Sequence, residues 1–169
     1  MFNVGDLIIY SAHGICHIDD ICEKTYNDVT KKYYVLHPLD NAKVSINIPV
    51  DSHTVVMLDM LDQDEAKVIM ELFKSPGVSW IENNNLRKKT YTDIINTGDR
   101  REISKILNTL MRKKMETDLT KEKLLDQDIQ QMYSIQQILF RDLSHSLHTS
   151  VESIRQQVSH SLKSSMQTT

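Results

Sequence analysis

The spacing of apolar residues changes near residue 60, and this change constrains the fold more than any other feature of the chain. Before that point apolar and polar residues alternate, as they do between Lys43 and Val50. After it, apolar residues recur every three or four positions, as at Ala66, Ile69 and Phe73. A period of two is typical of a half-buried strand, and a period near 3.6 is typical of an amphipathic helix. The pattern therefore predicts an α+β protein in which the strands come first and the helices follow.

The first sixty residues contain short apolar runs that are separated by turn residues. The runs include residues 7–10, 15–21, 31–37 and 43–50. About five short strands, joined by loops of hairpin length, predict a small antiparallel β-barrel of SH3 or Tudor-like type for residues 1–58. A barrel of this size is marginally stable alone and usually presents an edge or a face to a partner.

Helix start and stop signals divide the rest of the chain. Asp62 and Asp99 suit N-caps, and Gly98 suits the position that ends a helix. Thr120 is expected to cap a long last helix, and Trp80 to lie near the start of the second one. These signals predict an all-helical bundle of about four helices over residues 59–150. Residues 151–169 are rich in Ser and Gln, so we expect a C-terminal tail that is partly helical or disordered.

Motifs of catalysis are not found in the sequence. It contains no P-loop, no Gly-rich dinucleotide fingerprint, no GxSxG and no HExxH, and it has only four glycines. The adjacent carboxylates Asp19 and Asp20 would diverge on a strand. We therefore expect no catalytic residues, no cofactor and no enzymatic activity.

Two groups of side chains resemble metal ligands, but neither has the spacing of a metal site. Cys16 and His17 would point to opposite faces of a strand, so the first group cannot converge. The second group is one helical turn apart and lacks a third ligand. We therefore expect no metal. The groups are His13, Cys16, His17 and Cys22, and His145 with His148.

The two halves of the chain differ in charge. Residues 1–60 carry four lysines and eight acidic residues, a net charge of −4, whereas residues 80–115 carry nine basic and four acidic residues, a net charge of +5. A basic segment can bind a polyanion, although most charged runs are simply solvated. The only tryptophan, Trp80, lies in the basic segment, where it fits two roles. It can pack in the core, the commoner role, or act as a wedge against distorted DNA.

No apolar run reaches the roughly 18 residues of a membrane span, and the start of the chain lacks the basic region of a signal peptide. We therefore expect a cytoplasmic protein with free thiols and no membrane contact.

Three runs in the first sixty residues form a recognisable pattern: Phe2-x-Val4-Gly5-Asp6-x-Ile8-Ile9-Tyr10-x-x-His13-Gly14, Lys32-Tyr33-Tyr34-Val35-Leu36 and Ile46-x-Ile48-Pro49-Val50. Together they resemble the N-terminal module of the CarD/CdnL family of bacterial transcription regulators, which is also found in the transcription-repair coupling factor. The helical half continues the resemblance through Trp80, Arg87 and Gly98-Asp99 to about Leu147.

The resemblance implies a Tudor-like domain that binds the β subunit of RNA polymerase and a helical domain that contacts promoter DNA. Family members stabilise the open promoter complex without catalysis. The polymerase-contacting positions fall at Lys24, Tyr26 and Asn47. Lys24 and Asn47 replace arginines found in the family, and Asn47 loses the charge. Ser11 replaces the proline of the opening turn.

The resemblance places a tryptophan at the upstream fork of the bubble, in the minor groove, and it matches Trp80. Trp80 is farther from Gly98 than the corresponding pair in many members, so packing against the barrel stays an alternative. Basic residues around Trp80 would contact phosphates. The expected DNA-binding residues are Trp80, Arg87, Lys88, Lys89, Arg100 and Arg101.

The leading prediction is therefore a monomeric transcription regulator that binds the polymerase β subunit and promoter DNA, and that lies at the nucleoid through the polymerase. The alternative is a protein-only interaction module that binds a polymerase or repair partner without touching DNA. The two differ in one property, because only a phosphate-binding protein has a salt-dependent affinity for DNA.

Overall fold

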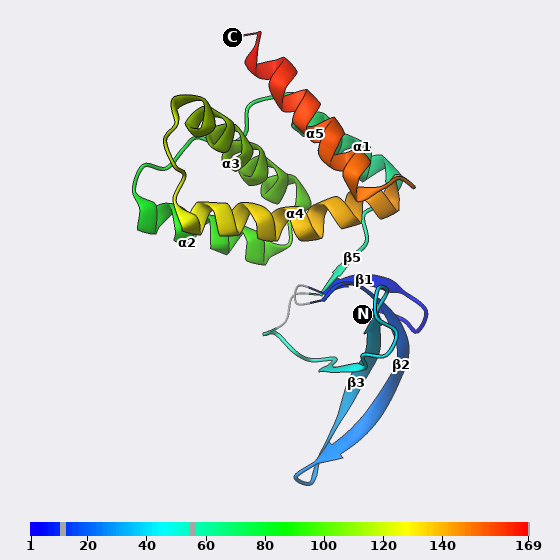
Figure 1. Cartoon of the computed structure of the whole chain (residues 1–169). Helices are drawn as coiled ribbons and strands as arrows, with labels where there is room; N and C mark the ends of the chain where they lie inside the picture. The colour runs from blue at the N-terminus through cyan, green and yellow to red at the C-terminus, as the bar shows by residue number, and fades with distance from the viewer. Residues whose placement is uncertain (11–12, 55–56, 169) are drawn as a thin grey trace. The chain divides into compact units, whose positions relative to one another are not determined.

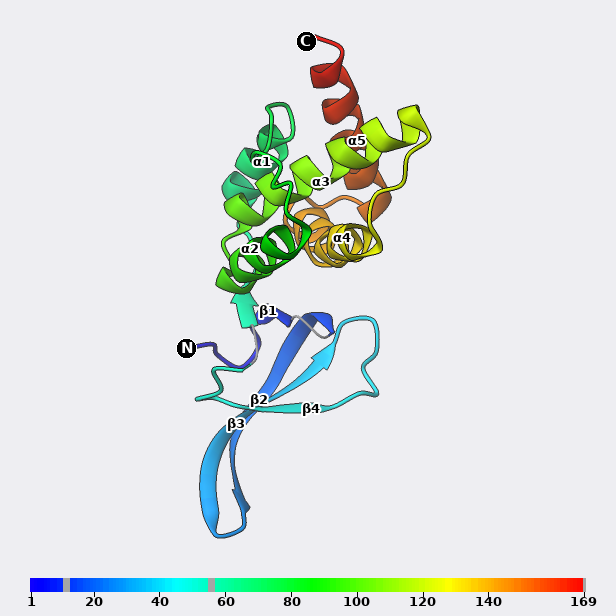
Figure 2. The same ribbon diagram turned by 90° about the vertical axis from the view of Figure 1, so that its left-hand side faces the viewer.

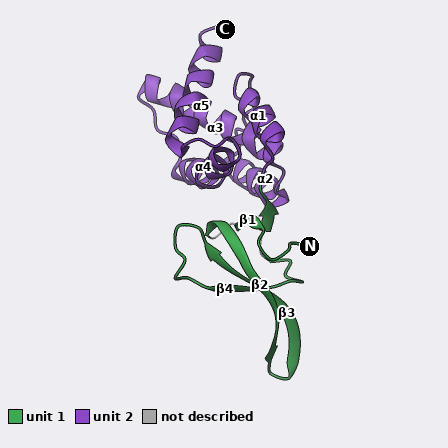
Figure 3. Ribbon diagram, turned by 90° about the vertical axis from the view of Figure 1, so that its right-hand side faces the viewer, with its two compact units in different colours: residues 1–60 green, residues 61–169 purple. Residues whose placement is uncertain are grey.

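The computed structural model describes residues 1–10, 13–54 and 57–168, so Ser11 lies outside the described residues. The chain forms two compact units, residues 1–60 and 61–169 (Figure 3). The sequence placed this boundary after residue 58. Strands make up the first unit and helices the second, which confirms the α+β class.

Five strands form one antiparallel sheet in the first unit, in the order β4-β3-β2-β1-β5. The expected barrel is not closed, because β4 and β5 are the two ends of this order and are not paired with each other in the described part of the chain. These two edge strands are short, with four and three residues. The strands are β1 (Leu7–Tyr10), β2 (Gly14–Tyr26), β3 (Val29–Pro38), β4 (Ile46–Pro49) and β5 (Met57–Asp59).

The strands β2 and β3 form a long hairpin that extends beyond β4 (Figure 2). Asn27 and Asp28 turn the hairpin, both with positive φ, as a two-residue loop between twisted strands requires. The register of β2 shifts between Ile18 and Asp20. One face of the sheet is apolar and packs in a core that includes Ile18. The hairpin therefore leaves an opposite face, the outer face, which is partly exposed to solvent.

Five helices build the second unit around one core (Figure 1). Asp62 and Asp99 cap helices, and Gly98 ends one in the left-handed conformation, as expected. Thr120 is not a cap: it is the last residue of α3, and the chain turns at Lys121. No helix in the described ranges is long and apolar enough to cross a membrane. The helices are α1 (Gln63–Leu72), α2 (Asn84–Thr97), α3 (Arg100–Thr120), α4 (Asp126–Ser146) and α5 (Val151–Met166).

The Ser- and Gln-rich segment forms the helix α5 from Val151 to Met166, which is the helical one of the two expected alternatives. The side chain of Ser150 caps α5 by accepting a hydrogen bond from the Ser153 amide. Ile154, Val158 and Leu162 have no exposed surface and belong to the same core as the other helices. The polar residues occupy the remaining faces, so the average composition of this segment conceals a narrow apolar stripe.

Candidate functional site

The outer face of the sheet brings together the three residues expected to contact the polymerase. Lys24 and Tyr26 follow the register shift on β2 and point to the same side, because residues two apart on a strand share a face. Asn47 lies on β4, on the other side of β3. The Nζ of Lys24 nevertheless donates a hydrogen bond to the Oδ1 of Asn47 at 2.7 Å. The pairing therefore joins two strands that are not neighbours in the sheet.

Aromatic and aliphatic side chains surround this hydrogen bond. The rings of Tyr26 and Tyr33 meet edge to face, with their centroids 5.9 Å apart. Tyr26 and Val29 are 58% and 55% exposed, so both offer apolar surface to the solvent at the end of the hairpin. We call Lys24, Tyr26, Val29, Tyr33 and Asn47 the hairpin patch. It combines exposed aromatic and aliphatic side chains with polar ones, as protein-binding surfaces do.

Trp80 lies before α2 rather than in it, because the helix begins at Asn84. The segment that carries Trp80 is held against α3: Thr109 Oγ1 donates to the Val78 carbonyl at 2.7 Å. A Cβ on Gly77 would clash with the Lys105 carbonyl, so this close approach requires glycine. Trp80 is partly buried and packs against the core of the helical unit.

Two cations lie over the Trp80 ring. The guanidinium carbon of Arg87 is 4.1 Å from the ring centroid, and the Nζ of Lys113 is 5.3 Å from it. These distances are within the range of cation–π attraction, which holds the ring in place. Lys113 is 35% exposed. Lys113 was assigned to the basic segment from the sequence, but its contact with Trp80 was not predicted. The two residues meet only after α3 is folded.

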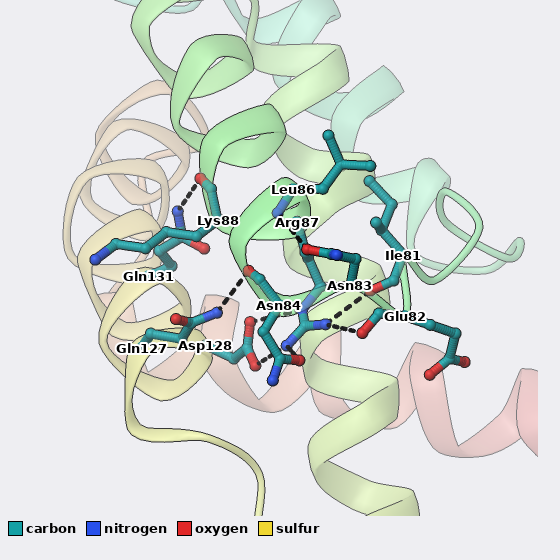
Figure 4. Close-up of polar contacts among 10 residues, drawn as sticks. All are labelled: Ile81, Glu82, Asn83, Asn84, Leu86, Arg87, Lys88, Gln127, Asp128 and Gln131. Carbon is teal, nitrogen blue, oxygen red and sulfur yellow. Dashed lines mark hydrogen bonds and ion pairs between the residues drawn. The ribbon is translucent and has the colours of Figure 1, made fainter.

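Arg87 is a buried structural residue, so it does not offer its charge to a phosphate at the surface. Its side chain is 2% exposed, and that of Asp128 on α4 is fully buried. Arg87 Nε donates to Asp128 Oδ1 at 2.9 Å, and Nη2 donates to Asp128 Oδ2 at 2.6 Å (Figure 4). The same guanidinium also donates to the Ile81 carbonyl at 2.7 Å and to Asn84 Oδ1 at 3.1 Å.

This network raises the pKa of Arg87 above its usual value, chiefly through the hydrogen bond with Asp128. It ties the start of α2 to the first turn of α4. Gln127 and Gln131 extend the contact, because their side-chain amides donate to the carbonyls of Asn84 and Lys88 (Figure 4). The prediction that Arg87 contacts DNA did not anticipate this burial, since its partner lies 41 residues away in the sequence.

The other predicted cations differ in how far they are free to bind. Lys88 and Lys89 are exposed on α2, and Lys89 makes a long contact of 3.5 Å with Asp93. Arg100 is 14% exposed and lies 3.3 Å from the buried Asp142. Its Nη1 also donates to the Gly98 carbonyl, so Arg100 connects α3 to α4 and to the preceding turn.

Arg101 is exposed but paired. It forms two hydrogen bonds with Glu65, at 2.7 and 2.8 Å, and these bonds lower the pKa of Glu65. An incoming phosphate would have to displace a bidentate carboxylate. Lys88 and Lys89 are therefore the cations of the predicted set that are readily available to a polyanion.

Comparison with known proteins finds a family model and a bacterial relative that the chain resembles. The family model described as the CarD-like/TRCF RID domain matches residues 2–58. A Bacillus subtilis (strain 168) protein named "Putative transcription factor YdeB" is 31% identical over 132 residues, which cover 75% of this chain and 84% of the relative. The second match extends beyond the first unit, so the similarity includes helical residues.

Proposed function

Because the chain belongs to the CarD/CdnL family of bacterial transcription regulators, its role lies in transcription, and we propose that it is a non-catalytic adaptor between RNA polymerase and promoter DNA. The hairpin patch would bind the β subunit of the polymerase, and the helical unit would contact the DNA. In this proposal the protein acts in the cytoplasm, at the promoter, and stabilises the open complex.

The hairpin patch is the observation that supports the proposed binding to the β subunit of the polymerase. An exposed tyrosine, a second ring and an exposed valine lie beside a lysine and an asparagine whose side chains are already joined. Aromatic residues carry much of the binding energy at protein interfaces. The strand β4 at the edge of the sheet adds backbone groups that a strand of the partner can pair with.

We expect Lys24→Glu combined with Asn47→Glu to weaken capture of the polymerase β subunit by at least about tenfold, because two acidic groups replace the hydrogen bond in the middle of the patch. Equilibrium binding of purified full-length chain to the β subunit measures this loss. Thr30→Glu with Lys32→Glu is the matched control, since it makes the same charge change on the opposite face of β3. If the two variants lost affinity for the β subunit equally, net charge alone would explain the loss. The hairpin patch would then be rejected as the binding surface.

The proposed contact with DNA rests on fewer residues than the set that was predicted from the sequence. Arg87 is buried, and Arg100 and Arg101 are paired with acids. Lys88 and Lys89 remain as exposed contacts for phosphates, and Lys113 lies over the Trp80 ring. Trp80 as a minor-groove wedge stays a prediction, since part of its ring already packs against the core. This reduced set gives weight to the protein-only module as the competing function.

Salt dependence decides between the two functions. We expect the chain to bind a promoter fragment with an affinity that falls as salt rises, and Lys88→Ala with Lys89→Ala to reduce the slope of log K against log [salt] by up to about 2. Lys67→Ala with Lys163→Ala removes the same charge from other helices and should leave the slope unchanged. A wild-type affinity that is absent or independent of salt would support the protein-only module.

The variant Trp80→Ala distinguishes the two roles of Trp80, a wedge in the minor groove and a residue of the helical core. If Trp80 is a wedge, the variant shortens the lifetime of the open complex more than it lowers thermal stability. If the ring only packs against the helical core, stability falls and the lifetime of the complex formed by the folded fraction does not change.

A further inference from the structure

Two histidines and an aspartate form a cluster on the outer face of the sheet. His17 on β2 lies directly opposite His37 on β3, and the ring centroids are 5.4 Å apart. Asp19 lies at the register shift between Ile18 and Asp20, so it has no partner residue on β3. Freed from the ladder, its carboxylate reaches both imidazoles. The bulge thus creates a three-residue group, which we call the His-Asp-His cluster.

The polar atoms of the cluster converge. His17 Nδ1 is 2.9 Å from Asp19 Oδ1, and His37 Nδ1 is 2.7 Å from Asp19 Oδ2. One ligand atom from each of the three residues lies within 4.8 Å of the other two. Ligands around a tetrahedral Zn²⁺ are about 3.3 Å apart, because zinc bonds to nitrogen and oxygen are about 2.0–2.2 Å long. Small side-chain movements would therefore open the cluster enough to admit an ion.

We propose that His17, Asp19 and His37 form a binding site for a divalent transition-metal ion, with Zn²⁺ as the best fit. Two imidazole nitrogens and one carboxylate oxygen are a ligand set that Zn²⁺ uses, and three protein ligands leave a fourth position for water or for a side chain of a partner.

The electrostatics of the first unit favour a cation at this position. The carboxylate of Asp19 lies within hydrogen-bond distance of both imidazoles, so an anionic oxygen is already placed beside both ring nitrogens. The side chains of His17, Asp19 and His37 are 36%, 39% and 26% exposed, which leaves an entry path from solvent. The first sixty residues also carry the net charge of −4 noted above.

The cluster differs from the metal sites considered in the sequence. Cys16 is fully buried in the core and faces away from His17, so the two do not act together. The missing partner of His17 is His37, twenty residues away, which only the register of β2 and β3 brings into place. Asp19 and Asp20 were expected to diverge on a strand, and the bulge places the carboxylate of Asp19 beside the two imidazoles. The proposed site does not depend on whether the sheet binds polymerase.

A titration with Zn²⁺ of full-length chain without an affinity tag tests the proposal. We expect calorimetry to find one tight Zn²⁺ per chain, and Co²⁺ to give the visible absorption of a low-coordinate site. His17→Gln with His37→Gln should lower the Zn²⁺ affinity by at least about tenfold, since even loss of an outer partner costs about 10- to 100-fold. Asp19→Asn should also lower it, because the amide has nearly the same shape but is neutral and a poorer ligand.

The control removes two histidines outside the cluster. His53 and His160 are exposed, and His53→Gln with His160→Gln should leave the Zn²⁺ affinity and the Co²⁺ spectrum unchanged. Circular dichroism of each variant verifies that it is folded. The proposal is overturned if the wild-type chain binds no Zn²⁺, or if the His17 and His37 double variant binds it as tightly as the control does.

Discussion

Removal of residues 151–169 is expected to unfold the helical unit rather than trim a flexible end. The truncation deletes Ile154, Val158 and Leu162, none of which has exposed surface. Burying one such side chain contributes about 1.5–3 kcal/mol, so the three together contribute about 5–9 kcal/mol. The whole free energy of unfolding of a domain is about 5–15 kcal/mol. The truncated chain should therefore lose cooperative unfolding in urea while the strands of the first unit remain.

A matched control keeps α5 and changes only its polar faces. Gln156 and Gln157 are exposed, and replacing both by Ala should leave the urea midpoint nearly unchanged. Leu162→Ala in the full chain gives an intermediate case, with an expected loss of about 2–5 kcal/mol. A truncated chain with the wild-type midpoint and the wild-type helical amplitude would contradict the placement of α5 in the core.

Local signals in the sequence predicted the features that depend on a few neighbouring residues. The caps at Asp62 and Asp99 and the left-handed Gly98 form as expected, because each needs only its own turn of helix. Of the period-two segment between Lys43 and Val50, the part from Ile46 to Pro49 forms the strand β4. Closure of the barrel is different, since it requires β4 and β5 to pair, and no local pattern in the sequence records whether the two ends of a sheet meet.

The end of the chain shows the limit of composition as a guide. The spacing of Val151, Ile154, Val158 and Leu162 is helical, but Ser and Gln on the other faces lower the mean hydropathy of the segment. Composition averages over all faces of a helix, whereas packing depends on one face. What that face packs against is set by α4 and the other helices, which lie far away in the sequence.

Some residues of the candidate sites could be predicted from the sequence, and others could not. Lys24 and Asn47 were placed by resemblance, and the sheet brings their side chains into contact. The His-Asp-His cluster was missed, because it needs a bulge and a cross-strand pair. Arg87 was grouped with Lys88 and Lys89, since neighbouring cations look alike in a sequence. Only the fold shows that one of the three turns inward.

Asp128→Ala is expected to destabilise the helical unit by about 3–5 kcal/mol, the cost of leaving a buried charge without its partner. Arg87 would keep its hydrogen bonds to the Ile81 carbonyl and to Asn84, but these are neutral acceptors. Loss of the carboxylate would also free the segment that carries Trp80, since the guanidinium lies over that ring. Urea denaturation measures the stability, and Trp80 fluorescence reports the local change.

The pair Arg101 and Glu65 provides the control, because it has the same bidentate geometry at the surface. Glu65→Ala should have a far smaller effect on stability, since water solvates and screens the remaining charge. Equal losses for Asp128→Ala and Glu65→Ala would show that burial of the Arg87 pair does not matter. Replacing Arg87 and Asp128 together by Met and Leu should restore much of the stability, because no unpaired charge then remains.

Arg87→Lys separates a structural role from a phosphate contact. Lysine keeps the positive charge but cannot form the two parallel hydrogen bonds with Asp128, nor reach the Ile81 carbonyl and Asn84 at the same time. A phosphate contact would tolerate the change, so DNA affinity and its salt slope would persist at wild-type stability. A buried anchor would not tolerate it: the urea midpoint should fall, while the salt slope of the folded protein stays the same. We expect the second result, because phosphate binding needs charge at the surface and Arg87 has none there.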